Sequence, residues 1–243
     1  MADDWWQYDD EGRPKYRENH YKFTGPVVGH LQAAFMNNWL RASNELLLGE
    51  SYFPALEATG ETRMQAVISS PSDGQKRIRT FLVLAFGGAR DSICIQVAYF
   101  YPDPVLKEAL IAAVERGVDV TVLVPGKKTN ENIVRFASRN RWGPLLEAGV
   151  HLYEYQPTGL HAKLFIIDDH LVSVGSSNFD NRSFRINDEA NVNILCADFG
   201  SYMREVFDAD LAESMRITPE AWRNRPIWER LAGFIGNAIG PQL

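Results

Sequence analysis

The sequence predicts an α/β domain with a mixed, largely parallel sheet that is flanked by helices on both faces. From residue 64 onward, short apolar segments rich in Val and Ile alternate with segments of helical periodicity. This strand–helix–strand order favours parallel strands joined by right-handed crossovers. The chain has 243 residues, of which 45% are hydrophobic, so it is long enough for one sizeable domain with a buried core.

The first sixty residues carry a weaker pattern. Residues 16–24 are compatible with a short strand, and residues 46–60 with a connection. Between them, a helix is predicted after Gly25-Pro26, because proline suits the first turn of a helix. Its inward-facing residues follow helical spacing: Val28, Leu31, Phe35 and Leu40.

The alternation that follows is regular as far as residue 125. Gly87-Gly88 can end a helix in the left-handed conformation, and Pro104 fits the first turn of another. In chain order, the predicted elements are strand 64–69, a turn at 71–74, helix 75–86, strand 92–99, helix 104–117 and strand 118–124.

The second half of the chain is predicted to hold most of the remaining strands. Helical segments run over residues 130–148 with an interruption near Gly143-Pro144, and the tail from residue 199 is predicted to be helical. A tight turn at 168–170 separates two strands. The predicted strands are 150–155, 161–168, 171–175 and 190–195.

Composition and charge exclude several classes of protein. The chain has 25 Lys and Arg against 31 Asp and Glu, a net charge of −6, which disfavours a sequence-blind nucleic-acid binder. Cys94 and Cys196 stand far apart and form no zinc motif. The N-terminus resembles no signal peptide, so a cytoplasmic location is expected, with contact at the surface of the inner membrane left open.

Four polar residues at the ends of two predicted strands suggest a site. On an extended strand, side chains two apart share a face, so His161 and Lys163 project together. Ser176 and Asn178 share a face after the next strand, and a hairpin can bring the four together. An ammonium, a hydroxyl and an amide suit an anionic tetrahedral ligand, which a neutral imidazole can attack. Asp168 has the opposite parity and is therefore predicted to position the turn.

The pattern HxKxxxxD followed by GSxN resembles the signature of the phospholipase D superfamily. His161, Lys163, Asp168, Ser176 and Asn178 occupy its positions. The flanks are similar to the bacterial cardiolipin synthase branch in seven segments: Tyr99–Asp103, Arg116–Val120, Pro125-Gly126, Tyr153–Tyr155, Pro157-Thr158, Asn178–Phe184 and Asn187–Asn191. The resemblance extends from about residue 25 to the C-terminus.

The resemblance implies a phospholipase D-like fold and a phosphodiester exchange that uses neither metal nor cofactor. One histidine attacks phosphorus to form a phosphohistidine, and a second histidine protonates the leaving alcohol. Lysine and asparagine side chains stabilise the phosphate oxygens. Glu189 stands where the family places a carboxylate that orients the imidazole. The implied substrate is phosphatidylglycerol or a similar phospholipid.

The chain departs from the family in one respect. Cardiolipin synthases of this type carry two such motifs, whereas the complete HxKxxxxD pattern occurs once here. Residues 1–24 resemble the end of a missing first half, and residues 25–243 a single phospholipase D-like domain. Activity is therefore expected to need a second motif, from a homodimer or from a separate N-terminal half.

Two alternatives stay open from the sequence. A single-motif homodimer could use water and act as a phosphodiesterase, or the chain could be a catalytically incomplete remnant. Ser176 and Asn178 are also good turn residues, and Glu189 could be a surface carboxylate. A C-terminal helix from Ile227 has an apolar face that could pack on the core or attach to a membrane surface.

Overall fold

The computed structural model describes residues 7–8, 12, 14–71, 76–128 and 132–238. The main sheet contains eight strands: β2 (Arg63–Ser69), β3 (Ser92–Gln96), β4 (Asp119–Pro125), β5 (His151–Tyr155), β7 (Leu164–Ile167), β8 (Leu171–Gly175), β9 (Glu189–Leu195) and β10 (Ser214–Ile217). Their spatial order is β10-β5-β4-β3-β7-β8-β9-β2. A separate pair, β1 (Tyr16–Arg17) and β6 (Gly159–Leu160), runs parallel.

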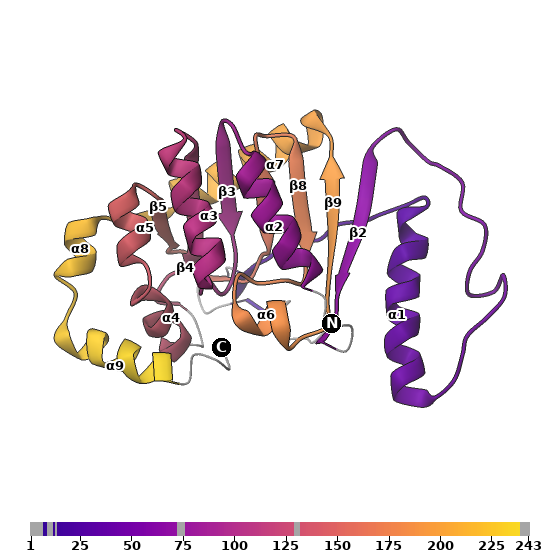
Figure 1. Ribbon diagram of the computed structural model, residues 1–243, viewed down its shortest axis with the longest axis horizontal. Coiled ribbons are helices and arrows are strands. Elements are labelled where there is room, and N and C mark those ends of the chain that lie inside the picture. The colour runs from indigo at the N-terminus through magenta and orange to yellow at the C-terminus, as the bar shows by residue number, and fades with distance from the viewer. Residues whose placement is uncertain (1–6, 9–11, 13, 72–75, 129–131, 239–243) are drawn as a thin grey trace.

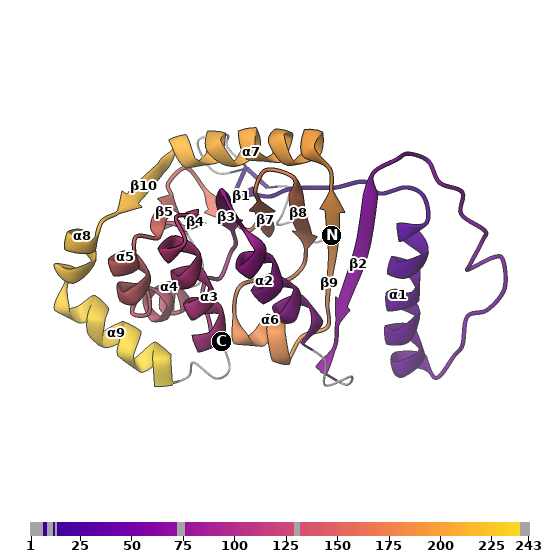
Figure 2. The same ribbon diagram turned by 45° about the horizontal axis from the view of Figure 1, so that its top comes forward.

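Helices cover both faces of this sheet. The helices of the described residues are α1 (Val27–Ser43), α2 (Arg77–Gly88), α3 (Pro104–Glu115), α4 (Asn132–Arg139), α5 (Gly143–Ala148), α6 (Asn181–Arg185), α7 (Ala197–Ala212), α8 (Pro219–Arg223) and α9 (Ile227–Ala238). Figure 1 and Figure 2 show α2 and α3 on one face and α7 across the other. Strand residues alternate between two apolar clusters: Ile93 joins the cluster with α2, and Cys94 the cluster with α7.

The α/β class and the mixed sheet between helices are confirmed, but the expectation of a largely parallel sheet is wrong. Within the described part of the chain, two of the seven neighbouring strand pairs are parallel, β3–β4 and β4–β5. Asp168 and Asp169 adopt φ values of 51° and 54°, which reverse the chain between β7 and β8. Because β9 is antiparallel to both β8 and β2, the rest of the sheet alternates in direction.

The predicted helical tail is only partly correct. It contains α7, α8 and α9, but β10 lies between them and pairs antiparallel with β5 at the edge of the sheet. Two of its four residues, Met215 and Arg216, are exposed, so the strand lacks an apolar run that would reveal it. The strand predicted over 16–24 shortens to β1, and most of the turn predicted at 71–74 lies outside the described residues.

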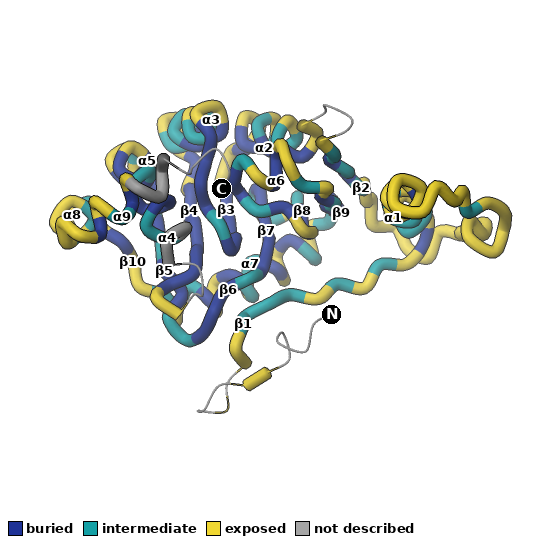
Figure 3. The backbone as a smooth tube through the Cα atoms, turned by 90° about the horizontal axis from the view of Figure 1, so that it is seen from below, coloured by how far each residue is buried: buried dark blue, intermediate teal, exposed yellow. Residues whose placement is uncertain are grey.

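Helix α1 and the connection after it lie beyond β2, at the edge of the main sheet. Figure 3 shows α1 largely exposed, next to β2. Val27 and Met36 are its buried residues, and the connection at 46–60 is irregular as expected. Among the described residues, no helix has the length and apolar character needed to cross a bilayer.

Candidate functional site

The polar residues singled out from the sequence gather around one hollow. It has a volume of about 820 Å³ and lies beside the ends of β6 and β8. Its walls come from three separate stretches of chain: Glu18, Asn19 and His20; His161 and Lys163; and Gly175, Ser176, Asn178, Ile186, Asn187, Asp188 and Glu189. Five of the six predicted site residues thus line the hollow, and Asp168 is the one that does not.

His161 and Lys163 lie in the short link between β6 and β7 rather than inside a strand. Lys163 Nζ is 2.8 Å from His161 Nε2 and 2.6 Å from the His161 carbonyl oxygen, to which it donates. The Lys163 residue is 8% exposed, whereas the His161 side chain is 31% exposed. The expected convergence of imidazole and ammonium is therefore present, with the imidazole more open to solvent.

A carboxylate from the N-terminal segment holds the imidazole. Glu18 Oε2 is 2.5 Å from His161 Nδ1, and because a carboxylate only accepts, Nδ1 is the donor. The position of Glu18 follows from β1, since Tyr16 pairs with Gly159 and Arg17 with Leu160. With its proton on Nδ1, the ring presents the Nε2 lone pair for nucleophilic attack.

Glycine is required where these two short strands meet. A Cβ on Gly159 would lie 2.8 Å from the Tyr16 ring, closer than side chains pack. The Tyr16 ring also packs edge-on against His161, with ring centroids 6.4 Å apart. The close approach therefore fixes both the carboxylate and an aromatic wall next to the imidazole.

Burial lowers the pKa of Lys163 from 10.5 to about 8. The carboxylates of Glu18, Glu189 and Asp180 oppose this shift but do not cancel it. The ammonium form is therefore present below pH 8 and is lost as the pH rises through that value. An anion bound next to Lys163 would favour the charged form.

Anion binding in the cavity is expected to weaken at alkaline pH. Sulfate does not titrate in this range, and it should bind at least about tenfold more weakly at about pH 9.5 than at about pH 7.5. Titration calorimetry or NMR shifts would measure this dependence. The matched variant Lys163→Arg should retain sulfate binding at the higher pH, because guanidinium stays protonated. Equal affinity of the unchanged chain at both pH values would contradict the prediction.

Ser176 and Asn178 follow β8 and are held by backbone contacts. The Ser176 hydroxyl donates to Glu189 and accepts from the amide of Ala190 at 3.0 Å. Asn178 Oδ1 accepts from the amide of Tyr99 at 3.3 Å, which fixes the plane of its carboxamide. A Cβ on Gly175 would lie 2.1 Å from the Ala190 carbonyl oxygen, so this sharp exit from the strand needs glycine.

Asp168 lies at the opposite end of β7, away from the cavity, as its parity predicted. Its carboxylate accepts from three backbone amides, those of Arg90, Asp91 and Ser92, at 2.8 to 3.2 Å. Burial acts to raise the pKa of Asp168, but these hydrogen bonds outweigh it and hold the pKa below its usual value. The residue ties the turn after β7 to the start of β3.

Glu189 is buried at 5% exposure on the Ser176 side of the cavity. Its carboxylate accepts from the Ser176 hydroxyl and from Asn187 Nδ2 at 3.2 Å. The sequence argument gave Glu189 the role of orienting the imidazole, whereas the carboxylate observed at Nδ1 of His161 is Glu18. Glu189 accepts a hydrogen bond from the hydroxyl that faces the same hollow, and its role at an imidazole stays a prediction.

The sequence reasoning missed the N-terminal contribution to the site. No motif marks Glu18, because its position depends on two-residue strands that pair far apart in the chain. A weak signal did exist for His20, since His20-Tyr21-Lys22 repeats the first three positions of HxKxxxxD, with Val27 where the aspartate would be. His20 is the second histidine among the residues described around this cavity.

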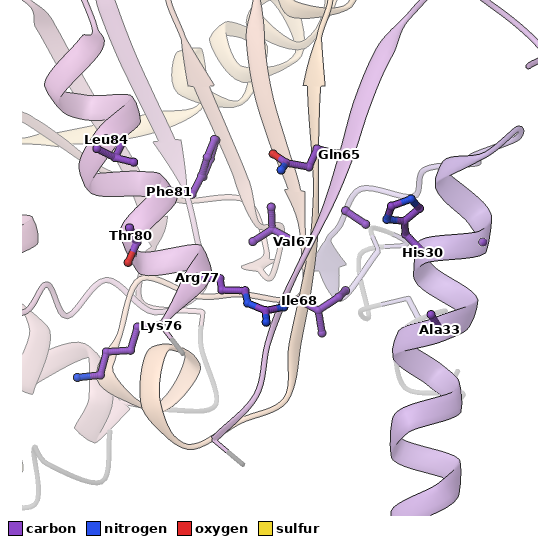
Figure 4. Close-up of a pocket in the computed structure, with 12 residues that line it drawn as sticks. His30, Ala33, Gln65, Val67, Ile68, Lys76, Arg77, Thr80, Phe81 and Leu84 are labelled. Carbon is purple, nitrogen blue, oxygen red and sulfur yellow. The ribbon is translucent and has the colours of Figure 1, made fainter. Parts of the chain in front are cut away.

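A second hollow, of about 970 Å³, lies between α1, β2 and α2. Figure 4 shows Val67 and Phe81 in its apolar wall, Arg77 extending toward β2 and Lys76 pointing away. His30 and Lys76 line it, but its described lining includes no carboxylate. Across the described residues, no group of three or more His, Cys, Asp or Glu side chains is arranged to hold a metal ion.

Comparison with known proteins identifies the family. The family model for the PLD-like domain of cardiolipin synthase, where PLD is phospholipase D, matches residues 82–211, more than half of the chain. The chain belongs to this family. A cardiolipin synthase of Oceanobacillus iheyensis is 35% identical over 229 residues, which cover 94% of this chain and 47% of that protein. The major cardiolipin synthase ClsA of Bacillus subtilis is 33% identical over 230 residues, covering 94% and 48%.

The chain therefore spans about half the length of the curated relatives it matches. Solved structures agree on the fold. Nuc from Salmonella typhimurium, a phospholipase D family member, superposes with a TM-score of 0.55 at 25% identity, over 65% of this chain and 99% of that chain. Phosphatidylserine synthase from Haemophilus influenzae gives a TM-score of 0.63 at 14% identity, over 85% and 52%. The phospholipase D-like fold expected from the resemblance is confirmed.

Proposed function

We propose that this chain supplies half of a phosphatidyltransferase site of the cardiolipin synthase type. The observation that carries the proposal is the imidazole of His161, held at Nδ1 by Glu18 and flanked at Nε2 by Lys163, inside a hollow with further donors. This arrangement suits attack on a phosphodiester. The relatives named cardiolipin synthase support the substrate class, a phospholipid that resembles phosphatidylglycerol.

In the proposed first step, Nε2 of His161 forms a bond to phosphorus, and the bond from phosphorus to the leaving glycerol oxygen breaks. A histidine of the second half gives its proton to that oxygen. In the second step, a hydroxyl of another phospholipid loses its proton to the same histidine and attacks phosphorus, which releases His161. Lys163, Ser176 and Asn178 stabilise the phosphate oxygens in both steps.

The positioning residues have separate tasks in this proposal. Glu18 fixes the His161 tautomer, Glu189 fixes the Ser176 hydroxyl, and Asp168 holds the turn that sets the β7–β8 hairpin. Asn178 is aligned by its contact with the backbone of Tyr99. These contacts prearrange the donors, so little reorganisation is needed when charge develops on phosphate.

The second histidine is proposed to come from another copy of the chain or from a separate N-terminal half. Residues 25–243 would form the catalytic domain, and the segment before them, which supplies Glu18, would be the end of a first half. The match to about half of each curated relative supports this arrangement. We place the site on the cytoplasmic side of the inner membrane, in peripheral contact with it.

A lipid assay tests the proposal. The full chain is incubated with labelled phosphatidylglycerol in mixed micelles, and the products are separated by thin-layer chromatography. Cardiolipin and free glycerol are the expected products, with a rate per protomer that rises with protein concentration as the second half is supplied. Phosphatidic acid alone would show that water is the acceptor and would contradict the transferase proposal.

Sedimentation of the same samples tests the shared site. The active species should be a dimer, because one motif provides one nucleophilic histidine. A strict monomer that makes cardiolipin would overturn the half-site proposal and would direct attention to His20 as the proton donor. No product at any concentration, even with a separate N-terminal half added, would identify the chain as an incomplete remnant.

A further inference from the structure

The C-terminal helix α9 exposes its apolar side. Four large apolar residues at positions 1, 2, 5 and 8 of the helix face solvent: Ile227, Trp228, Leu231 and Phe234, which are 73%, 60%, 60% and 74% exposed. Their spacing puts them on one side of the helix. The sequence allowed this face to pack on the core or to attach to a membrane. Trp228 packs edge-on against Phe136 of α4, with ring centroids 5.4 Å apart, but all four side chains stay more than half exposed.

The opposite side of α9 is anchored to the domain by polar contacts. Glu229, which is 7% exposed, lies 3.0 Å from Arg139 of α4 in an ion pair. Gly233 packs against α4 so closely that a Cβ would lie 2.6 Å from the carbonyl oxygen of Phe136. Rotating the helix to bury its apolar side would break the Glu229–Arg139 ion pair and move Gly233 away from α4. The exposed orientation is therefore fixed by the fold.

Cationic residues flank this apolar side. Arg230 is exposed on the same segment, and so is Arg223, which lies 3.7 Å from the exposed carboxylate of Glu147. The guanidinium of Arg225 stacks 4.1 Å from the centre of the Trp222 ring. The Glu229 carboxylate is already paired with Arg139. The segment therefore presents positive charge beside apolar side chains, although the whole chain carries a net charge of −6.

Helix α9 lies toward the same edge of the molecule as part of the wall of the catalytic hollow. Figure 1 and Figure 2 both show α9 and α6 along the same lower edge of the molecule. The wall of the hollow formed by Ile186–Glu189 directly follows α6. A flat surface that contacts this edge would thus lie near both the helix and the residues that line the site.

We propose that the exposed side of α9 docks on the surface of a bilayer that contains anionic phospholipid. An exposed tryptophan, aliphatic and phenyl side chains, and flanking arginines are the chemistry that inserts at the headgroup region. A second copy of the chain fits less well. Two-fold pairing would place α9 against α9 and would bring the same arginines, with like charge, toward one another.

Vesicle sedimentation tests the inference with the full chain. Vesicles of equal parts phosphatidylglycerol and phosphatidylcholine should bind the chain, and vesicles of phosphatidylcholine alone should bind it less. Leu231→Glu is expected to weaken binding to the anionic vesicles at least tenfold. Leu84→Glu is the matched control, since Leu84 is a 70% exposed leucine on α2, and it should bind like the unchanged chain.

The outcomes separate this inference from the proposed activity, because binding needs no turnover. His161→Ala should bind the vesicles normally whether or not the chain is a transferase. Failure of the unchanged chain to bind anionic vesicles would overturn the inference, as would equal losses in Leu231→Glu and Leu84→Glu. A Leu231→Glu variant that loses self-association in sedimentation but keeps vesicle binding would also overturn it and would assign the face to another copy.

Discussion

Replacing His161 with Ala is expected to lower the rate of lipid exchange by at least about a thousandfold. Without the imidazole, the group that is proposed to form the bond to phosphorus is missing. Lys163 should not substitute, because its amine is protonated below pH 8 and then has no lone pair for attack. Initial rates from the chromatographic assay measure the loss. Mass spectrometry of an acid-quenched reaction should detect a phosphatidyl adduct on His161 in the unchanged chain and none in the variant.

His30→Ala is the matched control for this experiment. His30 is an exposed histidine on α1, so its loss should leave the rate within about twofold of the unchanged chain. Thermal unfolding of both variants would show that they fold equally well. Full activity of His161→Ala would contradict the assigned nucleophile, and an adduct on His20 alone would move that role to the N-terminal segment.

The part of the site that lies close together in sequence could be predicted, and the part assembled by distant pairing could not. Alternation on a strand predicted that His161 and Lys163 converge and that Asp168 points elsewhere, and both features are present. Local geometry sufficed because few residues separate these groups. Glu18 lies 143 residues before His161, and only the pairing of β1 with β6 brings it there. Alternation within one segment carries no information about that partner.

The fold shows the same division between local and distant information. The helices other than α6 and most strands were predicted from apolar periodicity, which is a property of each segment by itself. The order of the strands was not, because β2 and β3, although joined by α2, are separated in the sheet by β7, β8 and β9. Periodicity reports which residues are buried but does not report which strand is the neighbour. A largely parallel sheet was expected because strands that follow one another in the chain were taken as neighbours in the sheet. Here β2 and β3 follow one another in the chain but are not neighbours.

Replacing Glu154 with Ala is expected to lower the free energy of unfolding by about 3 to 5 kcal/mol. Glu154 on β5 is fully buried and accepts from Arg135 Nε at 3.0 Å and from Arg135 Nη2 at 2.8 Å. Arg139 Nη1 lies 3.5 Å from the same carboxylate. The Arg135 and Arg139 side chains are only 8% and 10% exposed. Removal of the carboxylate therefore takes the counter-charge from Arg135 in a poorly solvated place and leaves Arg139 with Glu229 as its carboxylate partner. Urea unfolding followed by circular dichroism measures the change.

Glu147→Ala provides the comparison that isolates burial as the cause. Glu147 pairs with Arg223 at 3.7 Å, but both side chains are more than half exposed, so its loss should cost no more than about 1 kcal/mol. Equal costs for the two variants would contradict the argument that burial makes the Glu154 contacts important. Arg139 also holds Glu229 of α9, so the loss of Glu154 should loosen that helix as well. Faster proteolysis near α9 in Glu154→Ala than in Glu147→Ala would therefore indicate that the Arg139 guanidinium links β5 to α9.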